Sequence, residues 1–598
     1  MSVGVPLVVA AVLAVRARLG LDLGDGTHAV ALAVRLARGD QPFRDEMNLQ
    51  ALGSWPAVPF TWVWLHTVGL DGIVLASRLW FVGVALGVVA TTVAALRPLA
   101  RGSGRPLVTV AASAAVVPIA YNLPVIGYNT TPALLYLLAA ASLAGAIARG
   151  GGPREGRRRP TGAGWAVLGG TAAVLGAVSH PVTAPAAATL LVVGLLVTRG
   201  RARLALLAGA AGATAVLGAL LASVWGVGDL RDTLAFTAAY QGERVDRATR
   251  LTAWLGYLGG ELREPPTLVA LLLGMAAAVL LRLGRRTAGA ALVVGLGVAA
   301  AQGLTRARAS ATLTVEAWLS PVMATVLLLV LLPTALLTVT TARRQHALRP
   351  PRADAPPLGP LLALGVLPAL VGCLTVAAFT SSSPVWGAEG AVLAPAVLAV
   401  VLCALTGLLG LRASSRAGGT DVVAPGRPPP GSLATVAAAA VVLLALLASV
   451  VVTSFRDAPP TRLVAAAPAG AFAGLLTTER RAGEVASAQA AVRSCATPGA
   501  GVLAIGYPAA YLMGDVVART PVTWLGDFGP STAALVRRLD AGGVWPECVV
   551  RPATGWPARP AGAEAAADPL RARIDRDYAP VPLGTGTTGL VVLRRLAP

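Results

Sequence analysis

The chain has 598 residues, of which 55% are hydrophobic and only 13% are charged, and its mean hydropathy is +0.70. These values exclude a water-soluble protein of this size and indicate that a lipid bilayer surrounds most of the chain. The formal charge of +21 comes from arginines gathered in short loops, not from a basic face or a binding motif, which excludes nucleic acid as an expected partner.

Apolar segments of the length of membrane-spanning helices recur from the N-terminus to about residue 454. They predict about thirteen spans, at 3–15, 73–96, 107–120, 132–148, 165–178, 183–197, 204–225, 267–281, 288–302, 317–339, 361–379, 391–411 and 433–452. The first is short and lacks a basic leader, so we expect a short first helix or a truncated start rather than a signal peptide.

Alternate loops between these spans carry the arginines, beginning with Arg97, Arg101 and Arg105. The positive-inside rule makes those loops cytoplasmic and predicts a multi-pass protein of a bacterial cytoplasmic (inner) membrane. The other face then holds a first outer loop at 20–72, a second long outer loop at 227–266 and the C-terminal tail.

The tail is expected to be a small extracytoplasmic α/β domain at 455–598, after a membrane domain at 1–454. Helices are predicted at 482–492 and 531–539, and strands at 502–505, around 549 and at 589–593. Cys495 and Cys548 both lie in this part, where a disulfide can persist, so a disulfide pair and two separate thiols both stay open. The predicted fold class is therefore mainly α, a polytopic helix bundle with a C-terminal α/β domain.

The first outer loop is the place where chemistry is most expected, because it gathers carboxylates and a histidine, namely Asp22, Asp25, His28, Asp40, Asp45 and Glu46. An amphipathic helix at 27–37 is expected to lie in the membrane interface, with Arg35 and Arg38 toward lipid head groups. A carboxylate at this surface can take the proton of an attacking hydroxyl, and an arginine can neutralise a departing phosphate.

The order of motifs in this loop is similar to that of the GT-C superfamily of integral membrane glycosyltransferases. The residues that carry the resemblance are Asp-Gly-Thr-His at 25–28, Gly-Asp-Gln-Pro-Phe-Arg-Asp-Glu at 39–46 and Asp-Gly-Ile-Val-Leu-Ala-Ser-Arg at 71–78. The resemblance covers residues 20–80 and implies a donor in which a sugar is carried on a polyprenyl phosphate.

In that family an aspartate of the first outer loop is the catalytic base, a role that falls by position on Asp25, with Asp22 as the alternative. Gly24 stands where many members have a second acid, which leaves the assignment between the two open. Asp45 and Glu46 match a second acidic element that in relatives positions substrate or a divalent metal such as Mg²⁺ or Mn²⁺. The purely structural alternative is that Asp25 caps the helix that follows it.

Further polar residues on the same predicted face are candidates for substrate binding: His28, Arg78, Tyr128, Asn129, His180, Arg306 and Arg308. His28 is interpreted as a partner of a phosphate or an acid, and Arg78 as a charge near the leaving phosphate. Each has a structural alternative. His28 would be an interfacial histidine and Arg78 an arginine that reaches the head groups. The turns with Tyr128, Asn129 and His180 would be ordinary polar turns, and Arg306 and Arg308 an exception to the positive-inside rule.

The leading hypothesis is an inverting transferase that moves a sugar from a polyprenyl-phosphate donor to an extracytoplasmic glycan, lipid or protein of the cell envelope. A transporter or flippase for a lipid-linked substrate is the alternative from another class, although neither midplane charges nor inverted repeats favour it. A non-catalytic membrane scaffold of the same fold is the third possibility.

Overall fold

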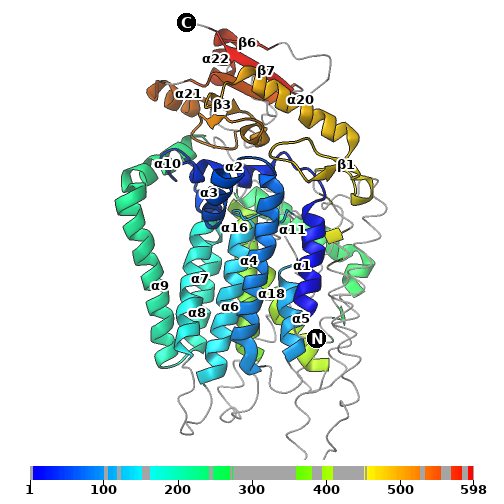
Figure 1. The fold of residues 1–598 in the computed structure, drawn as a ribbon. Helices are drawn as coiled ribbons and strands as arrows, with labels where there is room; N and C mark the ends of the chain where they lie inside the picture. Colours follow the sequence, from blue (N-terminus) through cyan, green and yellow to red (C-terminus); the bar gives the residue numbers. More distant parts are fainter. Residues whose placement is uncertain are drawn as a thin grey trace, which may run out of the picture.

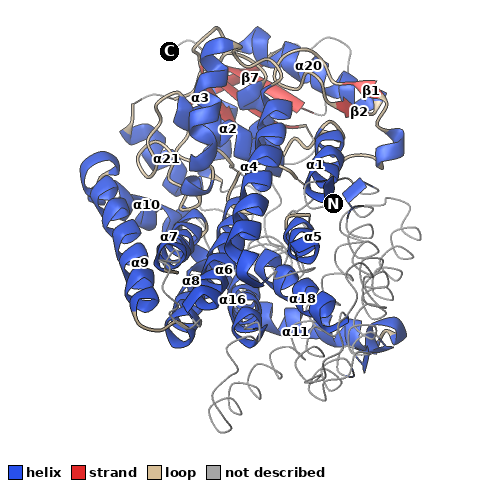
Figure 2. Ribbon diagram, turned by 60° about the horizontal axis from the view of Figure 1, so that its bottom comes forward, coloured by secondary structure: helices blue, strands red, loops and turns tan. Residues whose placement is uncertain are grey.

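The computed structural model describes residues 4–99, 105–117, 123–150, 162–240, 247–269, 358–379, 393–408, 456–525, 532–543, 545–553, 568–581 and 590–596, with a few single residues between them. The described part is mostly helical, with a small sheet region at one end (Figures 1 and 2).

Apolar helices run side by side and form a bundle (Figure 1). They are α1 (Gly4–Ala17), α4 (Ile73–Leu96), α5 (Arg105–Ala115), α6 (Thr130–Gly150), α7 (Ala163–Ser179), α8 (Ala184–Val197), α9 (Arg201–Leu220), α16 (Leu358–Phe379) and α18 (Leu393–Leu408). Among the described residues, three stretches are long and apolar enough to cross a membrane, Ile73–Leu96, Thr130–Arg149 and Arg201–Trp225. The chain is thus a membrane protein built on a helix bundle.

The predicted spans agree with these helices to within a few residues wherever the structure describes them, and 73–96 coincides with α4. Two predicted spans, 288–302 and 317–339, lie outside the described residues, and 267–281 and 433–452 do so for the greater part. The count of about thirteen stays a prediction for that reason.

The second long outer loop folds into two helices, α10 (Val227–Tyr240) and α11 (Arg247–Arg263). The first outer loop also holds two: α2 (Asp25–Ala37), which lies across one end of the bundle, and α3 (Val58–Thr67) (Figure 1). Trp62 and Val63 of α3 are more than half exposed, and Phe60 stacks on Trp80 of α4 at 5.0 Å between ring centroids. This aromatic face continues the outward face of α4, as expected for side chains at the lipid–water boundary.

The C-terminal part forms a five-stranded sheet in the order β4-β3-β5-β7-β6. Its strands are β3 (Gly501–Ala504), β4 (Val517–Ala518), β5 (Cys548–Pro552), β6 (Tyr578–Pro580) and β7 (Leu590–Arg595). β3 pairs in parallel with β4 and β5, whereas β7 pairs antiparallel with β5 and β6. The accompanying helices are α20 (Glu479–Cys495), α21 (Thr532–Ala541) and α22 (Pro569–Asp577), and a short antiparallel pair, β1 (Ala465–Ala466) and β2 (Leu476–Thr477), lies before α20.

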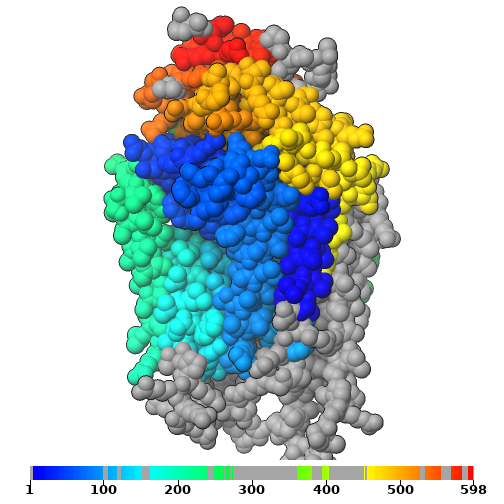
Figure 3. All heavy atoms as spheres, viewed as in Figure 1, coloured from blue at the N-terminus to red at the C-terminus, as the bar shows by residue number. Residues whose placement is uncertain are grey.

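The sheet domain sits directly on the first outer loop and on α10 (Figures 1 and 3). One hydrophobic cluster joins residues around α2, such as Leu21 and Val30, to Phe472 and Val485 of the tail. A second cluster joins Met47 of the first outer loop and Phe236 of α10 to the other face of the sheet, with Leu503, Val549 and Leu593. Because these cores are shared, the tail and the first loop are packed as one unit at this end of the bundle.

A disulfide joins Cys495, the last residue of α20, to Cys548, the first residue of β5. The two cysteines are 53 residues apart in the sequence, so the disulfide restricts the unfolded chain. Its loss is expected to lower the free energy of unfolding by about 2 to 4 kcal/mol.

We expect the double variant Cys495→Ala, Cys548→Ala to unfold at a lower temperature than the unaltered protein in a thermal scan in detergent. The difference should disappear when both proteins are scanned in the presence of a reductant. Cys373→Ala serves as the control, since Cys373 is buried in the bundle and takes no part in the disulfide. Equal midpoints for the double variant and the unaltered protein would contradict this expectation.

Candidate functional site

The N-terminus of α2 separates the two aspartates that compete for the role of base. Asp22 lies just before the helix, is 2% exposed, and accepts hydrogen bonds from the backbone N–H groups of Gly24 at 3.0 Å and Gly26 at 2.5 Å. Burial raises the pKa of Asp22, although the charge of Arg456 and these two hydrogen bonds oppose the rise. Asp22 thus satisfies the free N–H group of Gly26 in the first turn of the helix, the capping function considered for Asp25.

Asp25, the first residue of α2, faces other parts of the chain. The Tyr128 hydroxyl donates to its Oδ1 at 3.2 Å, and Nη2 of Arg456 lies 3.4 Å from its Oδ2. The side chain of Asp25 is 14% exposed, so it is less deeply buried than Asp22, which is 2% exposed. Gly24 leaves room for the Arg456 guanidinium in its present position, because a Cβ there would require Nη1 of Arg456 to shift.

Arg456 and Trp524 are the residues of this site that sequence reasoning missed. Arg456 has a left-handed backbone with φ of 54°, and its guanidinium lies 5.9 Å from the centroid of the Trp524 ring. A signal for Arg456 existed, because an arginine directly after the last apolar segment breaks the positive-inside pattern on the predicted outer side. Nothing in the sequence pattern around Trp524 singles it out.

His28 lies one turn after Asp25 on the same face of α2. Its ring contacts the rings of Tyr128, at 6.0 Å, and Trp524, at 5.2 Å between centroids. Burial, aided by the charge of Arg35, lowers the pKa of His28 to about 3, so the imidazole is neutral at neutral pH. A neutral imidazole does not fit the cationic phosphate partner that the sequence suggested.

Two turns from other parts of the bundle complete this surface. Tyr128 precedes α6, and its ring meets that of His180, in the turn between α7 and α8, at 5.8 Å. Nε2 of His180 lies 3.2 Å from Nε2 of Gln50 in the first loop. The structure therefore brings together Asp25, His28, Tyr128 and His180, and Asn129 lies half-buried next to Tyr128 in the chain.

The turns are held together by a close approach at Gly53. A Cβ at Gly53 would lie 2.7 Å from the backbone nitrogen of Tyr128 and 2.8 Å from the carbonyl oxygen of Ser179. The Thr131 hydroxyl donates to the Gly53 carbonyl at 2.7 Å. Only glycine allows the first loop to approach both turns this closely.

The remaining candidate arginines lie elsewhere. Arg78 is 2% exposed and its Nη1 donates to the carbonyl oxygens of Ala17 and Gly20, both at 2.9 Å, so it ties α4 to the end of α1. This arrangement is neither the head-group contact nor the phosphate contact expected for it. Arg306 and Arg308 lie outside the described residues.

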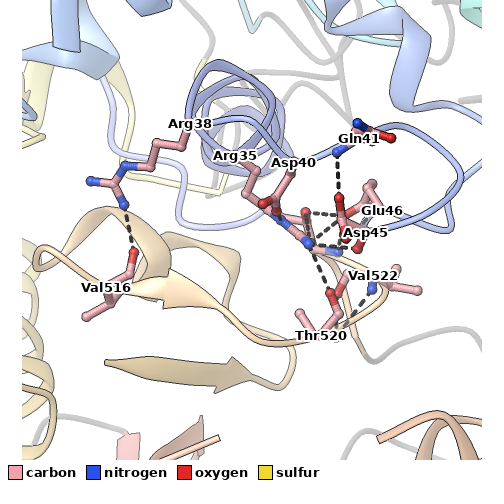
Figure 4. A network of polar contacts seen from close by, with 10 residues as sticks. Arg35, Arg38, Asp40, Gln41, Asp45, Glu46, Val516, Thr520 and Val522 are labelled. Atoms are coloured by element: carbon pink, nitrogen blue, oxygen red, sulfur yellow. Dashed lines mark hydrogen bonds and ion pairs between the residues drawn. The ribbon is translucent and has the colours of Figure 1, made fainter. Parts of the chain in front are cut away.

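Arg35 and Arg38 do not point to lipid head groups, and that prediction is wrong, because the tail domain covers α2. Arg35 is 5% exposed, and its guanidinium contacts Asp40 at 2.7 Å and Glu46 at 2.6 Å (Figure 4). It also donates to the carbonyl oxygens of Asp45 and Thr520, while Arg38 donates to the Val516 carbonyl at 2.7 Å (Figure 4).

The second acidic element is part of the same network. Glu46 is fully buried and accepts from the backbone N–H of Thr523 at 2.9 Å and from its hydroxyl at 2.6 Å. Asp45 accepts from the backbone N–H of Gln41 at 2.8 Å. In the described part of the chain, no group of three or more His, Cys, Asp or Glu side chains is arranged to hold a metal ion.

No protein-family model and no curated protein matches the chain. Among solved structures, the chain is similar to ArnT from Cupriavidus metallidurans bound to undecaprenyl phosphate, with 13% identity, a TM-score of 0.44, and coverage of 100% of this chain and 97% of that one. It is also similar to the archaeal oligosaccharyltransferase AglB from Archaeoglobus fulgidus in complex with an inhibitory peptide and a dolichol-phosphate, with 11% identity, a TM-score of 0.36, and coverage of 92% and 69%. At these scores neither structure is evidence for the activity of this chain.

Proposed function

We propose that this protein is a membrane glycosyltransferase that moves a sugar from a polyprenyl-phosphate donor to an acceptor of the cell envelope, a glycan, a lipid or a protein, with Asp25 as the general base. The observation that carries the proposal is the placement of the partly exposed Asp25 carboxylate 3.4 Å from the Arg456 guanidinium at one end of the bundle. A base and a cation for a phosphate are the two groups that such a transfer needs.

In the proposed reaction, a hydroxyl oxygen of the acceptor attacks the anomeric carbon of the donor sugar. Asp25 accepts the hydroxyl proton while the bond between that carbon and the phosphate oxygen breaks. Arg456 then neutralises the negative charge that the released polyprenyl phosphate gains. Attack opposite to the departing phosphate inverts the configuration of the sugar.

Arg456 takes the role that was expected for Arg78, since Arg78 is only 2% exposed and its Nη1 donates to backbone carbonyls. The side chain of Arg456 is 46% exposed, so its charge is already in contact with solvent. It can therefore bind a phosphate without the cost of a deeply buried charge.

We further propose that this end of the bundle is extracytoplasmic. α4 begins at this end with Ile73 and finishes at the opposite end, where Arg97 follows it (Figure 1). Arginine-rich short loops favour the cytoplasmic side, which leaves Asp25 and the tail domain on the outer side.

The test uses purified protein in proteoliposomes with undecaprenyl-phosphate sugars labelled in the sugar, offered together with a cell-envelope extract, with and without chelator. We expect label to pass from the lipid to a larger acceptor with release of undecaprenyl phosphate. Movement of intact labelled lipid across the bilayer would instead identify a flippase. Absence of both activities would leave a scaffold and remove the proposed function.

A further inference from the structure

Four rings form a continuous row across the candidate site. They come from the tail domain (Trp524), α2 (His28), the turn before α6 (Tyr128) and the turn between α7 and α8 (His180). Successive centroids are 5.2, 6.0 and 5.8 Å apart, and the planes meet at 69°, 58° and 89°. These are distances and tilts of rings in contact, so the row is a packed cluster that joins four parts of the chain.

The polar atoms of His28, in the middle of this row, lack partners in the described part of the chain. His28 is 2% exposed, and neither of its ring nitrogens has a hydrogen-bond partner within the part of the chain that the structure describes. His180, which is 3% exposed, differs from His28 because its Nε2 lies 3.2 Å from Nε2 of Gln50. Because nearly all buried polar groups of folded proteins are paired, an imidazole with neither nitrogen paired indicates that a ligand supplies its partners.

The chemistry of the row favours an uncharged, hydroxyl-bearing ligand. A neutral imidazole offers one N–H donor and one nitrogen acceptor, which together match a pair of hydroxyl groups and not a phosphate. The neighbouring aromatic rings offer apolar faces, on which the C–H groups of a sugar ring can pack.

We propose that His28 binds hydroxyl groups of the donor's sugar ring, with Tyr128 and Trp524 packed against the apolar face of that ring. The proposal rests on the proposed function, and it specifies which side chains hold the sugar rather than the phosphate. Asp25 and His28 are three residues apart on α2, so a sugar held at His28 lies beside the base and beside Arg456.

Trp524 controls access to His28 in this arrangement. Its ring meets the imidazole edge-on in this structure, so the indole must shift before a sugar reaches the ring nitrogens. Trp524 directly follows Thr523, whose N–H and hydroxyl are fixed by Glu46, and the tail domain thereby contributes to the sugar site.

The test is His28→Leu, which removes both nitrogens and keeps an apolar side chain of similar size. We measure binding of undecaprenyl phosphate and of a panel of undecaprenyl-phosphate hexoses and pentoses. The dissociation constant for the best sugar-bearing lipid should rise about 10- to 100-fold, as expected when hydrogen bonds to a buried polar group are lost, while that for undecaprenyl phosphate stays within about twofold. His28→Gln, which keeps a donor and an acceptor, should recover part of the loss.

Stability without ligand is the second measurement. Because His28→Leu removes an unsatisfied buried group, the unfolding midpoint of the ligand-free protein should not fall and is expected to rise. His66→Leu is the matched control, since His66 lies exposed on α3 and its Nδ1 contacts the Trp62 carbonyl of the same helix.

The outcomes separate the two proposals. Unchanged affinity of His28→Leu for the sugar-bearing lipids, or an equal loss for lipids with and without sugar, would overturn the sugar contact while the transferase stands. A lower unfolding midpoint of ligand-free His28→Leu would show that His28 stabilises the fold instead of binding a ligand. If the unaltered protein binds neither class of lipid, the proposed function itself fails, and the sugar site fails with it.

Discussion

Replacing Asp25 with asparagine should lower the rate of sugar transfer by about 10²- to 10⁴-fold, the contribution of a positioned general base. Asparagine cannot accept the acceptor's proton, but its carbonyl oxygen still accepts the hydrogen bond from Tyr128. The lost ion pair with Arg456 is partly exposed and contributes little to stability, so the protein should stay folded. The measurement is kcat with labelled donor, together with the unfolding midpoint in detergent.

Two further variants make this result specific. Asp71→Asn is the matched control, because Asp71 belongs to the same loop, is exposed, and accepts a hydrogen bond from the Gly470 N–H at 2.8 Å, which asparagine also does. Asp22→Asn tests the alternative base and should lower the unfolding midpoint more than the transfer rate, since both Asp22 oxygens accept backbone N–H groups and asparagine keeps only one acceptor oxygen. A fully active Asp25→Asn protein would remove Asp25 from the mechanism.

Removing the guanidinium of Arg35 should destabilise the contact between the first loop and the tail domain by about 3 to 5 kcal/mol, the usual effect of leaving one partner of a buried ion pair alone. Arg35→Met leaves Glu46 fully buried without its cation at 2.6 Å, and it leaves the Thr520 carbonyl without its donor. Burial already raises the pKa of Glu46, so without Arg35 the carboxyl is expected to hold a proton instead of a charge. We expect an earlier unfolding midpoint and faster proteolysis of the tail.

Arg38→Met is the matched control for Arg35→Met. Arg38 belongs to the same helix end and pairs with Asp515 at 2.9 Å, but the two side chains are 30% and 69% exposed. An exposed pair contributes less than about 1 kcal/mol, so this variant should behave almost like the unaltered protein. The double variant Arg35→Met, Glu46→Leu should recover much of the loss, because it leaves no buried charge unpaired. Similar midpoints for Arg35→Met and Arg38→Met would contradict the importance given to the buried network.

The variants at Asp25 and Arg35 also distinguish residues that act in the reaction from residues that stabilise the fold. Asp25 and Glu46 both belong to the acidic first loop, and the sequence pattern alone treats them alike. Asp25 has access to solvent and a cation that suits a phosphate in Arg456, whereas both Glu46 oxygens are used inside the protein. A change at Asp25 should therefore alter rate without stability, and a change in the Arg35 network should alter stability first.

The sequence by itself determined the features that depend on local composition. A helix such as α4 could be placed to the residue because burial in lipid requires a continuous apolar stretch of about 20 residues. The helix at α20 and the strands at β3 and β7 could be placed to within about three residues from periodicity and apolar runs. The concentration of acids likewise marked the first loop as the region where chemistry is most expected.

Only the tertiary structure decided which partner each polar group meets. Amphipathic patterning shows that one side of α2 is apolar and the other polar, but it does not tell whether water, head groups or a protein domain covers the polar side. The tail domain covers it, which turns Arg35 inward to Glu46 and brings Arg456 to Asp25 across most of the length of the chain. Apolar burial follows from composition along the chain, whereas pairing of charges depends on surfaces that come together only when the chain folds.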